Sequence, residues 1–187
     1  MTEYHPGLDG VIATESSISD IDGERGILSY RGYSIEELAE KSTFEETAFL
    51  LLTGELPTKT ELENFKSDIV GSMDLPTELI DLLQAYPKKS DSMFVLQSVI
   101  AVLGSYYSVD FDAEKLKTNY YTKDYYLKVS AILLGSIGSV VATWNRIKNK
   151  KDVISPDKGM NYAQNFMLML DDSINTVSYT HLTLPTR

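Results

Sequence analysis

The chain has 187 residues, of which 43% are hydrophobic and 24% are charged, and its formal net charge is −10 at pH 7. These values are typical of a soluble globular protein, and the negative charge disfavours nucleic acid as a partner because phosphate binding needs clustered lysine and arginine. The absence of cysteine excludes disulfides, thiolate nucleophiles and cysteine-ligated zinc, and is consistent with a cytoplasmic protein. The first residues also lack the basic and apolar regions of a signal peptide.

Residues 11–30 predict a small β-hairpin near the start of the chain. Apolar runs at 18–21 and 27–30 flank an Asp-Gly pair, Asp22-Gly23. Asp-Gly between apolar runs is a hairpin signal, because glycine adopts the positive φ that tight turns require.

Three helix starts carry the capping-box pattern, in which a Ser or Thr side chain and a Glu three residues later satisfy free amides of the first turn. The pairs are Ser34 with Glu37, Thr43 with Glu46, and Thr58 with Glu61. The second start predicts a helix that Gly54 ends, since glycine is favoured after a helix C-terminus. The third predicts a helix over about 59–71, and Pro76 opens a short helix that ends at Pro87.

Two longer helices are predicted in the second half of the chain. Residues 92–107 are apolar on more than one face, which is typical of a buried helix. Residues 122–149 predict a helix about 40 Å long, with a strip of small residues where another helix could approach closely: Ala131, Gly135, Ser139 and Ala142.

The uncharged stretch 129–145 is near the lower limit for a membrane span. It contains Ser, Thr and Asn, so we interpret it as the middle of a buried helix in a soluble protein, without a membrane partner. A further short helix or turn is expected at 112–117.

No reactive centre can be identified from the residues alone. The two histidines, His5 and His181, lie near the chain ends and are interpreted as exposed and non-catalytic, so no Ser-His-Asp arrangement is supported. The carboxylate pairs Glu36-Glu37 and Glu45-Glu46 lie in predicted first turns, where the helix dipole stabilises negative charge. Asp20, Asp22 and Glu24 resemble a calcium loop, but Arg25 stands where an EF-hand needs glycine.

Three weaker patterns have structural interpretations. The basic run is interpreted as a solvated helix C-terminus, with an anion-binding site as the alternative; it comprises Arg146, Lys148, Lys150 and Lys151. Tyrosine doublets at 106–107, 120–121 and 125–126 are expected to pack at helix ends. Gly135-x-x-Gly138 is too weak a pattern to indicate a dinucleotide site. We therefore predict no catalytic, substrate-binding, cofactor-binding or metal residue in this chain.

Three segments resemble the citrate synthase family. Residues 26–39 read Gly-Ile-Leu-Ser-Tyr-Arg-Gly-Tyr-Ser-Ile-Glu-Glu-Leu-Ala, residues 51–58 read Leu-Leu-Thr-Gly-Glu-Leu-Pro-Thr, and 161–170 resemble a later Asn-Phe helix start of the family. The resemblance implies a mostly α-helical fold in which residues 1–170 are the N-terminal part of the large domain, with the small β-hairpin at its front. It also implies a homodimer. The predicted helices 92–107 and 122–149 resemble the helices that form the dimer interface in the family.

The resemblance further implies condensation of acetyl-CoA with oxaloacetate to give citrate and CoA, with no metal or redox cofactor. In the family, two histidines and an aspartate carry the chemistry, and further histidine and arginine residues bind oxaloacetate. All of those motifs lie downstream of the matched region, so no residue here inherits their roles. Arg25 and Arg31 belong to the N-terminal motif and are not assigned to substrate. We expect an inactive N-terminal fragment; the alternatives are a fragment of a 2-methylcitrate synthase, which would use propionyl-CoA, and a non-catalytic helical interaction module.

Two segments depart from the family pattern. Asp91-Ser92-Met93 stands where the family often has His-Pro-Met. Residues 171–187 do not match, and 177–187 resemble translated read-through of a sequencing adaptor at the broken end of an assembled gene. We predict that this tail is an artefact and packs poorly.

Overall fold

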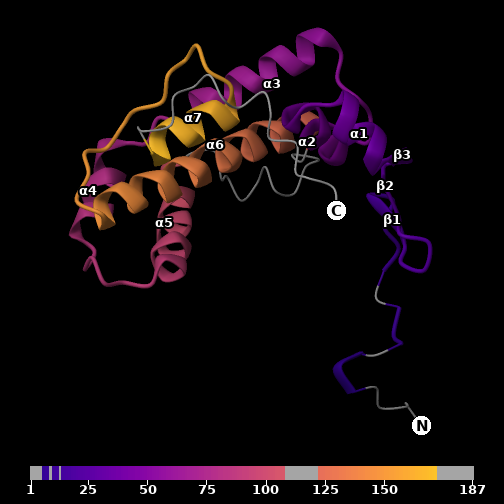
Figure 1. The fold of residues 1–187 in the computed structure, drawn as a ribbon, viewed down its shortest axis with the longest axis horizontal. Helices are drawn as coiled ribbons and strands as arrows, with labels where there is room; N and C mark the ends of the chain where they lie inside the picture. Colours follow the sequence, from indigo (N-terminus) through magenta and orange to yellow (C-terminus); the bar gives the residue numbers. More distant parts are fainter. Residues whose placement is uncertain (1–5, 9, 13, 108–121, 172–187) are drawn as a thin grey trace. The chain divides into compact units, whose positions relative to one another are not determined.

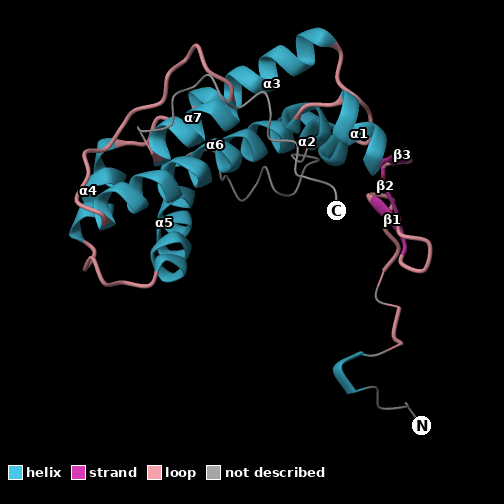
Figure 2. Cartoon of the chain, in the orientation of Figure 1, coloured by secondary structure: helices cyan, strands magenta, loops and turns pink. Residues whose placement is uncertain are grey.

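The computed structural model describes residues 6–8, 10–12, 14–107 and 122–171. The chain divides into two compact units, Met1–Pro57 and Thr58–Arg187. In the described part, the first unit contains a three-stranded sheet, a short 3-10 turn at Pro6–Leu8 and two helices, and the second contains five helices (Figure 2). The mostly α-helical fold with a small N-terminal β element is therefore confirmed.

The sheet of the first unit is antiparallel, in the order β1-β2-β3. Strands β1 (Ser19–Asp22) and β2 (Ile27–Tyr30) form the predicted hairpin, and β3 (Tyr33–Ser34) adds a short third strand that the sequence did not reveal. The positive φ of the hairpin turn is at Gly26 (φ 67°), and the Asp-Gly pair does not supply it. The turn spans the four residues between the strands, so its left-handed residue comes at the end.

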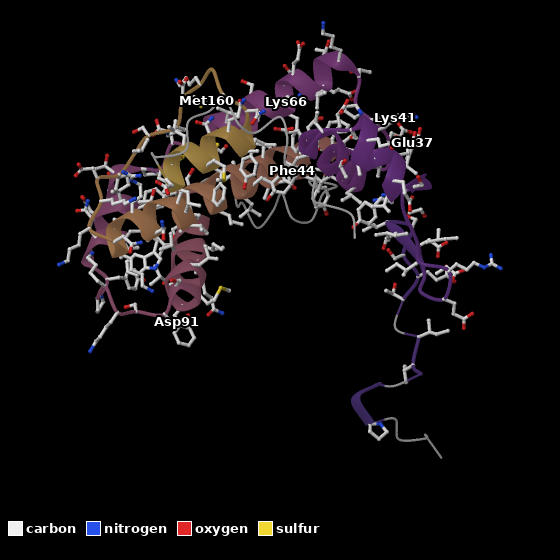
Figure 3. All side chains as sticks on the ribbon, viewed as in Figure 1. Glu37, Lys41, Phe44, Lys66, Asp91 and Met160 are labelled. Carbon is white, nitrogen blue, oxygen red and sulfur yellow. The ribbon has the colours of Figure 1, made fainter. Side chains whose placement is uncertain are left out.

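Helices α1 (Ile35–Lys41) and α2 (Phe44–Thr53) complete the first unit. The capping box at Thr43 is complete, because its hydroxyl accepts from the Glu46 amide at 3.2 Å and the Glu46 carboxylate accepts from the Thr43 amide at 2.9 Å. Only half of the predicted box at Ser34 forms. Its hydroxyl accepts from the Glu37 amide at 3.1 Å, but the Glu37 carboxylate instead pairs with Lys41 one turn later, also at 3.1 Å (Figure 3).

The second unit is built around one long helix, α6 (Lys123–Lys148), which contacts each of the other four helices (Figure 1). These are α3 (Lys59–Gly71), α4 (Thr77–Ala85), α5 (Ser92–Tyr107) and α7 (Tyr162–Leu170). Four of the five had been expected within one or two residues of these bounds, and the capping box that begins α3, at Thr58, is complete. The helix or turn expected at 112–117 lies outside the described residues.

Small residues let α6 approach its neighbours closely, as the sequence predicted. A Cβ added at Gly135 would lie 2.3 Å from the carbonyl oxygen of Ile69 in α3, and one at Gly138 would lie 2.9 Å from the Tyr162 hydroxyl of α7. By length and composition α6 could cross a membrane, but half of its apolar window is buried inside the unit. The core helix of a soluble protein can have the same length and composition.

The expectation that α5 is buried on all sides is wrong. Val95, Val99 and Leu103 are at most 1% exposed and pack in the core, but Met93 is 67% exposed and Phe94 is 72% exposed. In the described part of the second unit, α5 is covered by α4 and α6 on one side. Apolar composition therefore does not reveal that a face of this helix is open.

Candidate functional site

The described residues contain no arrangement typical of acid–base or metal chemistry. Both histidines lie outside the described part, and within it no three His, Cys, Asp or Glu side chains come together to hold a metal ion. The Thr58 amide and hydroxyl lower the pKa of Glu61, and burial raises the pKa of Tyr162. Both shifts move the group away from neutral pH, where a general base works best.

The acidic residues near the hairpin have a structural role. Asp22 accepts a hydrogen bond from the Arg25 amide at 3.0 Å, and its other oxygen is 3.6 Å from the Arg25 guanidinium. Asp22 is therefore used to close the turn.

Arg31 joins the sheet to α2 in the first unit. Its guanidinium donates to the Ser17 hydroxyl at 2.8 Å and to the Leu51 carbonyl at 2.9 Å. Its backbone has φ 51°, an uncommon conformation for a residue with a Cβ. These contacts within the chain support a scaffold role for Arg31, whereas the sequence could show only that it belongs to the N-terminal motif.

Asn165 in α7 is a buried polar residue that sequence reasoning missed as an individual position. Its side chain is fully buried and makes three bonds to the backbone of the preceding loop. Its Oδ1 accepts from the Asp157 amide at 2.6 Å, and its Nδ2 donates to the carbonyls of Asp157 at 2.9 Å and Met160 at 3.1 Å. The only signal was its place in the Asn-Phe segment. It holds the loop that leads into α7.

The basic run at the end of α6 does not behave as one solvated cluster. Arg146 is 3% exposed and its Nε donates to the Asp152 carbonyl, so it belongs to the fold. Lys151 pairs with Asp171 at 3.7 Å. Lys148 instead borders a cavity. The interpretation as a solvated helix end is therefore wrong for Arg146, which packs its stem and charge into the loop after α6.

A cavity of about 240 Å³ lies beside Lys148 in the second unit. It lies between α5, α6 and the end of α7. Asp91, the residue just before α5, marks this end of α5 in Figure 3. Its lining is formed by Ser92, Met93, Leu96, Val140, Val141, Trp144, Asn145, Lys148 and Leu170. A second cavity, near Thr143 and Met169, has only about 20 Å³, little more than the space that one water needs.

The comparisons with known proteins agree on one family. The family model described as "Citrate synthase, C-terminal domain" matches residues 7–183. Citrate synthase of Synechocystis sp. is 36% identical over 171 residues, which cover 90% of this chain and 41% of that protein. The crystal structure of citrate synthase from Pyrobaculum aerophilum matches with a TM-score of 0.81 and 34% identity, over 89% of this chain and 42% of that one.

A third match is a citrate synthase of Thermoplasma acidophilum, solved as a ternary complex with carboxymethyl coenzyme A and oxaloacetate. It has a TM-score of 0.77 and 26% identity, over 91% of this chain and 42% of that one. The chain thus spans about two fifths of the length of the relatives that it matches. A family model that matches most of its residues, together with the same fold in solved relatives, shows that the chain belongs to the citrate synthase family.

Proposed function

We propose that the whole protein to which this chain belongs condenses acetyl-CoA with oxaloacetate to give citrate and CoA. The observation that carries this proposal is the structural match to the Pyrobaculum aerophilum citrate synthase, with a TM-score of 0.81. The Thermoplasma acidophilum relative holds oxaloacetate and a coenzyme A analogue, which supports the two substrates. We propose that this reaction uses no metal or redox cofactor. We also propose that the protein is cytoplasmic.

The proposed reaction needs groups of a kind that the described part of the chain does not bring together. A base must take a proton from the acetyl methyl group, and a hydrogen-bond donor must stabilise the enolate. The enolate carbon then attacks the ketone of oxaloacetate, and hydrolysis of the thioester releases CoA. The described residues contribute caps, core side chains and close helix packing. We therefore propose that this chain is an N-terminal scaffold portion and is inactive alone.

An assay of free CoA thiol tests both parts of this proposal. The purified 187-residue chain, given acetyl-CoA and oxaloacetate, should release CoA no faster than a blank without protein. A protein that extends this reading frame into histidine-bearing family motifs should release CoA in a manner that depends on oxaloacetate. Turnover by the 187-residue chain would contradict the scaffold proposal, and an extended protein that prefers propionyl-CoA would favour the 2-methylcitrate alternative.

Sequencing the genomic DNA beyond codon 170 tests whether the chain is a portion of a longer enzyme. We expect the genomic reading frame after codon 170 to continue with family motifs. We also expect the residues that it encodes there to differ from residues 171–187 of this chain. A genuine stop after codon 187 would instead favour the non-catalytic interaction module. The family model matches as far as residue 183, although residues 171–187 were expected to depart from the family. The genomic sequence decides between these two possibilities for the tail.

We also propose a homodimer for the whole protein. The support in this structure is the apolar surface left on α5, where Met93 and Phe94 are exposed, together with Leu133 (39% exposed) and Tyr126 (50% exposed) on α6. Light scattering of the extended protein should give twice the mass of one chain, and a monomer at micromolar concentration would contradict the proposal.

A further inference from the structure

The turn between β1 and β2 starts at an Asp-Gly pair, Asp22-Gly23, in the first unit (Figure 2). Asp-Gly bonds are prone to isomerise, because glycine has no Cβ to shield its amide nitrogen from the preceding carboxyl group. The surroundings of this pair add no shield. A Cβ added at Gly23 would have no neighbour within 4 Å, and the Asp22 side chain is 42% exposed. The two groups that react in an isomerisation are therefore adjacent and uncrowded here.

The isomerisation involves only these two residues and water. The Gly23 amide nitrogen attacks Cγ of Asp22 and forms a carbon–nitrogen bond. One carboxylate oxygen leaves as water, with the amide proton and one proton from solvent. Water then hydrolyses the resulting succinimide ring. Where it breaks the bond between the Gly23 nitrogen and the backbone carbonyl carbon of Asp22, the chain continues through Cγ and residue 22 becomes isoaspartate. No oxidant, cofactor or partner protein is needed.

In the folded hairpin, Arg25 holds the Asp22 carboxylate. Oδ1 of Asp22 accepts a hydrogen bond from the Arg25 amide at 3.0 Å, and Oδ2 lies 3.6 Å from the Arg25 Nε. The amide bond is the stronger restraint, because the guanidinium is 78% exposed and an exposed ion pair contributes little. The β1–β2 ladder also pairs Asp22 with Ile27. The carboxylate that must meet the Gly23 nitrogen is thus fixed in orientation while the turn is closed.

We propose that Asp22-Gly23 is a site of spontaneous isoaspartate formation, and that the Arg25 amide slows this modification in the folded hairpin. Isoaspartate adds one carbon to the backbone between residues 22 and 23 and takes the carboxylate away from the Arg25 amide. The pairing of residue 22 with Ile27 is then lost, so the modification opens the hairpin at its turn. The proposal goes beyond the condensation reaction, because it involves neither the substrates nor the groups of that reaction.

The experiment compares the 187-residue protein with a synthetic peptide of residues 16–28, which lacks most of β2, in the same buffer at the same temperature. Proteolysis after Glu15 separates this pair from Asp9-Gly10, the other Asp-Gly pair of the chain. Labelling with an isoaspartyl methyltransferase then measures isoaspartate in the fragment that starts at residue 16. We expect isoaspartate in both samples, and about fivefold slower formation in the protein, since the hydrogen bond to the carboxylate must first break. Equal rates, or no isoaspartate in the protein fragment, would overturn the proposal.

Variants at the two residues test the site and its restraint separately. Gly23→Ala fits the turn, because Gly23 has no positive φ and its added Cβ meets no atom within 4 Å. It should slow isoaspartate formation about tenfold or more, since the Cβ crowds the attacking nitrogen. An unchanged rate in Gly23→Ala would show that the isoaspartate arises at another residue.

Two variants of Arg25 form a matched pair. Arg25→Ala removes the exposed ion pair but keeps the amide donor, and should change the rate by less than about twofold. Arg25→Pro removes the amide donor, and should raise the rate about fivefold, to that of the peptide. Equal rates in these two variants would refute the role of the Arg25 amide.

Discussion

Gly135→Ala in α6 is the substitution that most directly tests the close packing at the centre of the second unit. The added Cβ would lie 2.3 Å from the Ile69 carbonyl oxygen, 2.9 Å from the Cβ of Ser72 and 3.0 Å from its carbonyl carbon. Two of these atoms are backbone at the end of α3, so no flexible side chain can move aside. The adjacent bond from the Ser136 hydroxyl to the Ser72 carbonyl, at 3.2 Å, would be strained as the helices separate.

The expected magnitude is the difference between two effects. Overpacking a core costs about 1–3 kcal/mol, and contact with backbone places this site near the upper end, at about 3 kcal/mol. Replacing a glycine inside a helix by alanine returns about 1 kcal/mol through the backbone entropy of the unfolded chain. The net effect is a loss of about 2 kcal/mol in the free energy of unfolding, which lowers Tm by roughly 4–8 °C for a protein of this size.

Urea unfolding followed by far-UV circular dichroism measures this change, with Gly104→Ala as the matched control. Gly104 also lies inside a helix, α5, but an added Cβ there would have no neighbour within 4 Å. The control should therefore raise the free energy of unfolding, by up to about 1 kcal/mol. The packing argument would be refuted if Gly135→Ala were as stable as the parent, or if both variants changed stability in the same direction.

Two further predictions concern polar groups. Asn165→Ala should lower the free energy of unfolding by about 1–3 kcal/mol, since it leaves part-buried backbone groups of Asp157 and Met160 without their side-chain partner. A loss under about 0.5 kcal/mol in urea would show that water replaces the amide. The pKa of Glu61 lies below its ordinary value of 4.5, chiefly through hydrogen bonds from Thr58. The ionised Glu61 carboxylate therefore stabilises the folded state above pH 4.5. This contribution is lost as the pH falls through the pKa that Glu61 has in the folded state, which lies below 4.5. Thr58→Ala should raise the pKa of Glu61 toward 4.5 in a carboxyl NMR titration, and an unchanged pKa would contradict the capping explanation.

Local patterns in the sequence predicted most of the secondary structure. The boxes at Thr43 and Thr58 and the left-handed Gly54 (φ 90°) mark helix ends through contacts within four residues. The same reasoning was incomplete at Ser34, because Lys41 competes for the Glu37 carboxylate. It also did not find β3, since a two-residue strand carries no periodic pattern of its own.

The candidate site could be predicted only in part. The basic run raised the alternative of an anion site, but its members have different environments: Arg146 is buried and Lys148 borders a cavity. Residues from α5 and α7 complete that cavity, and the sequence distance between them hides the connection. The prediction that the chain carries no catalytic residue stays a prediction, and so does the boundary after residue 170.

By itself, the sequence determined the family, the helix bounds and the small residues that allow close packing along α6, because motifs, caps and helical spacing are local. Only the tertiary structure decided which face of α5 stays open, how Asn165 secures the loop before α7, and that Lys148 meets Ser92 beside an apolar wall. Each of these depends on atoms that are far apart in the chain. Their positions follow from packing around α6, which no local pattern encodes.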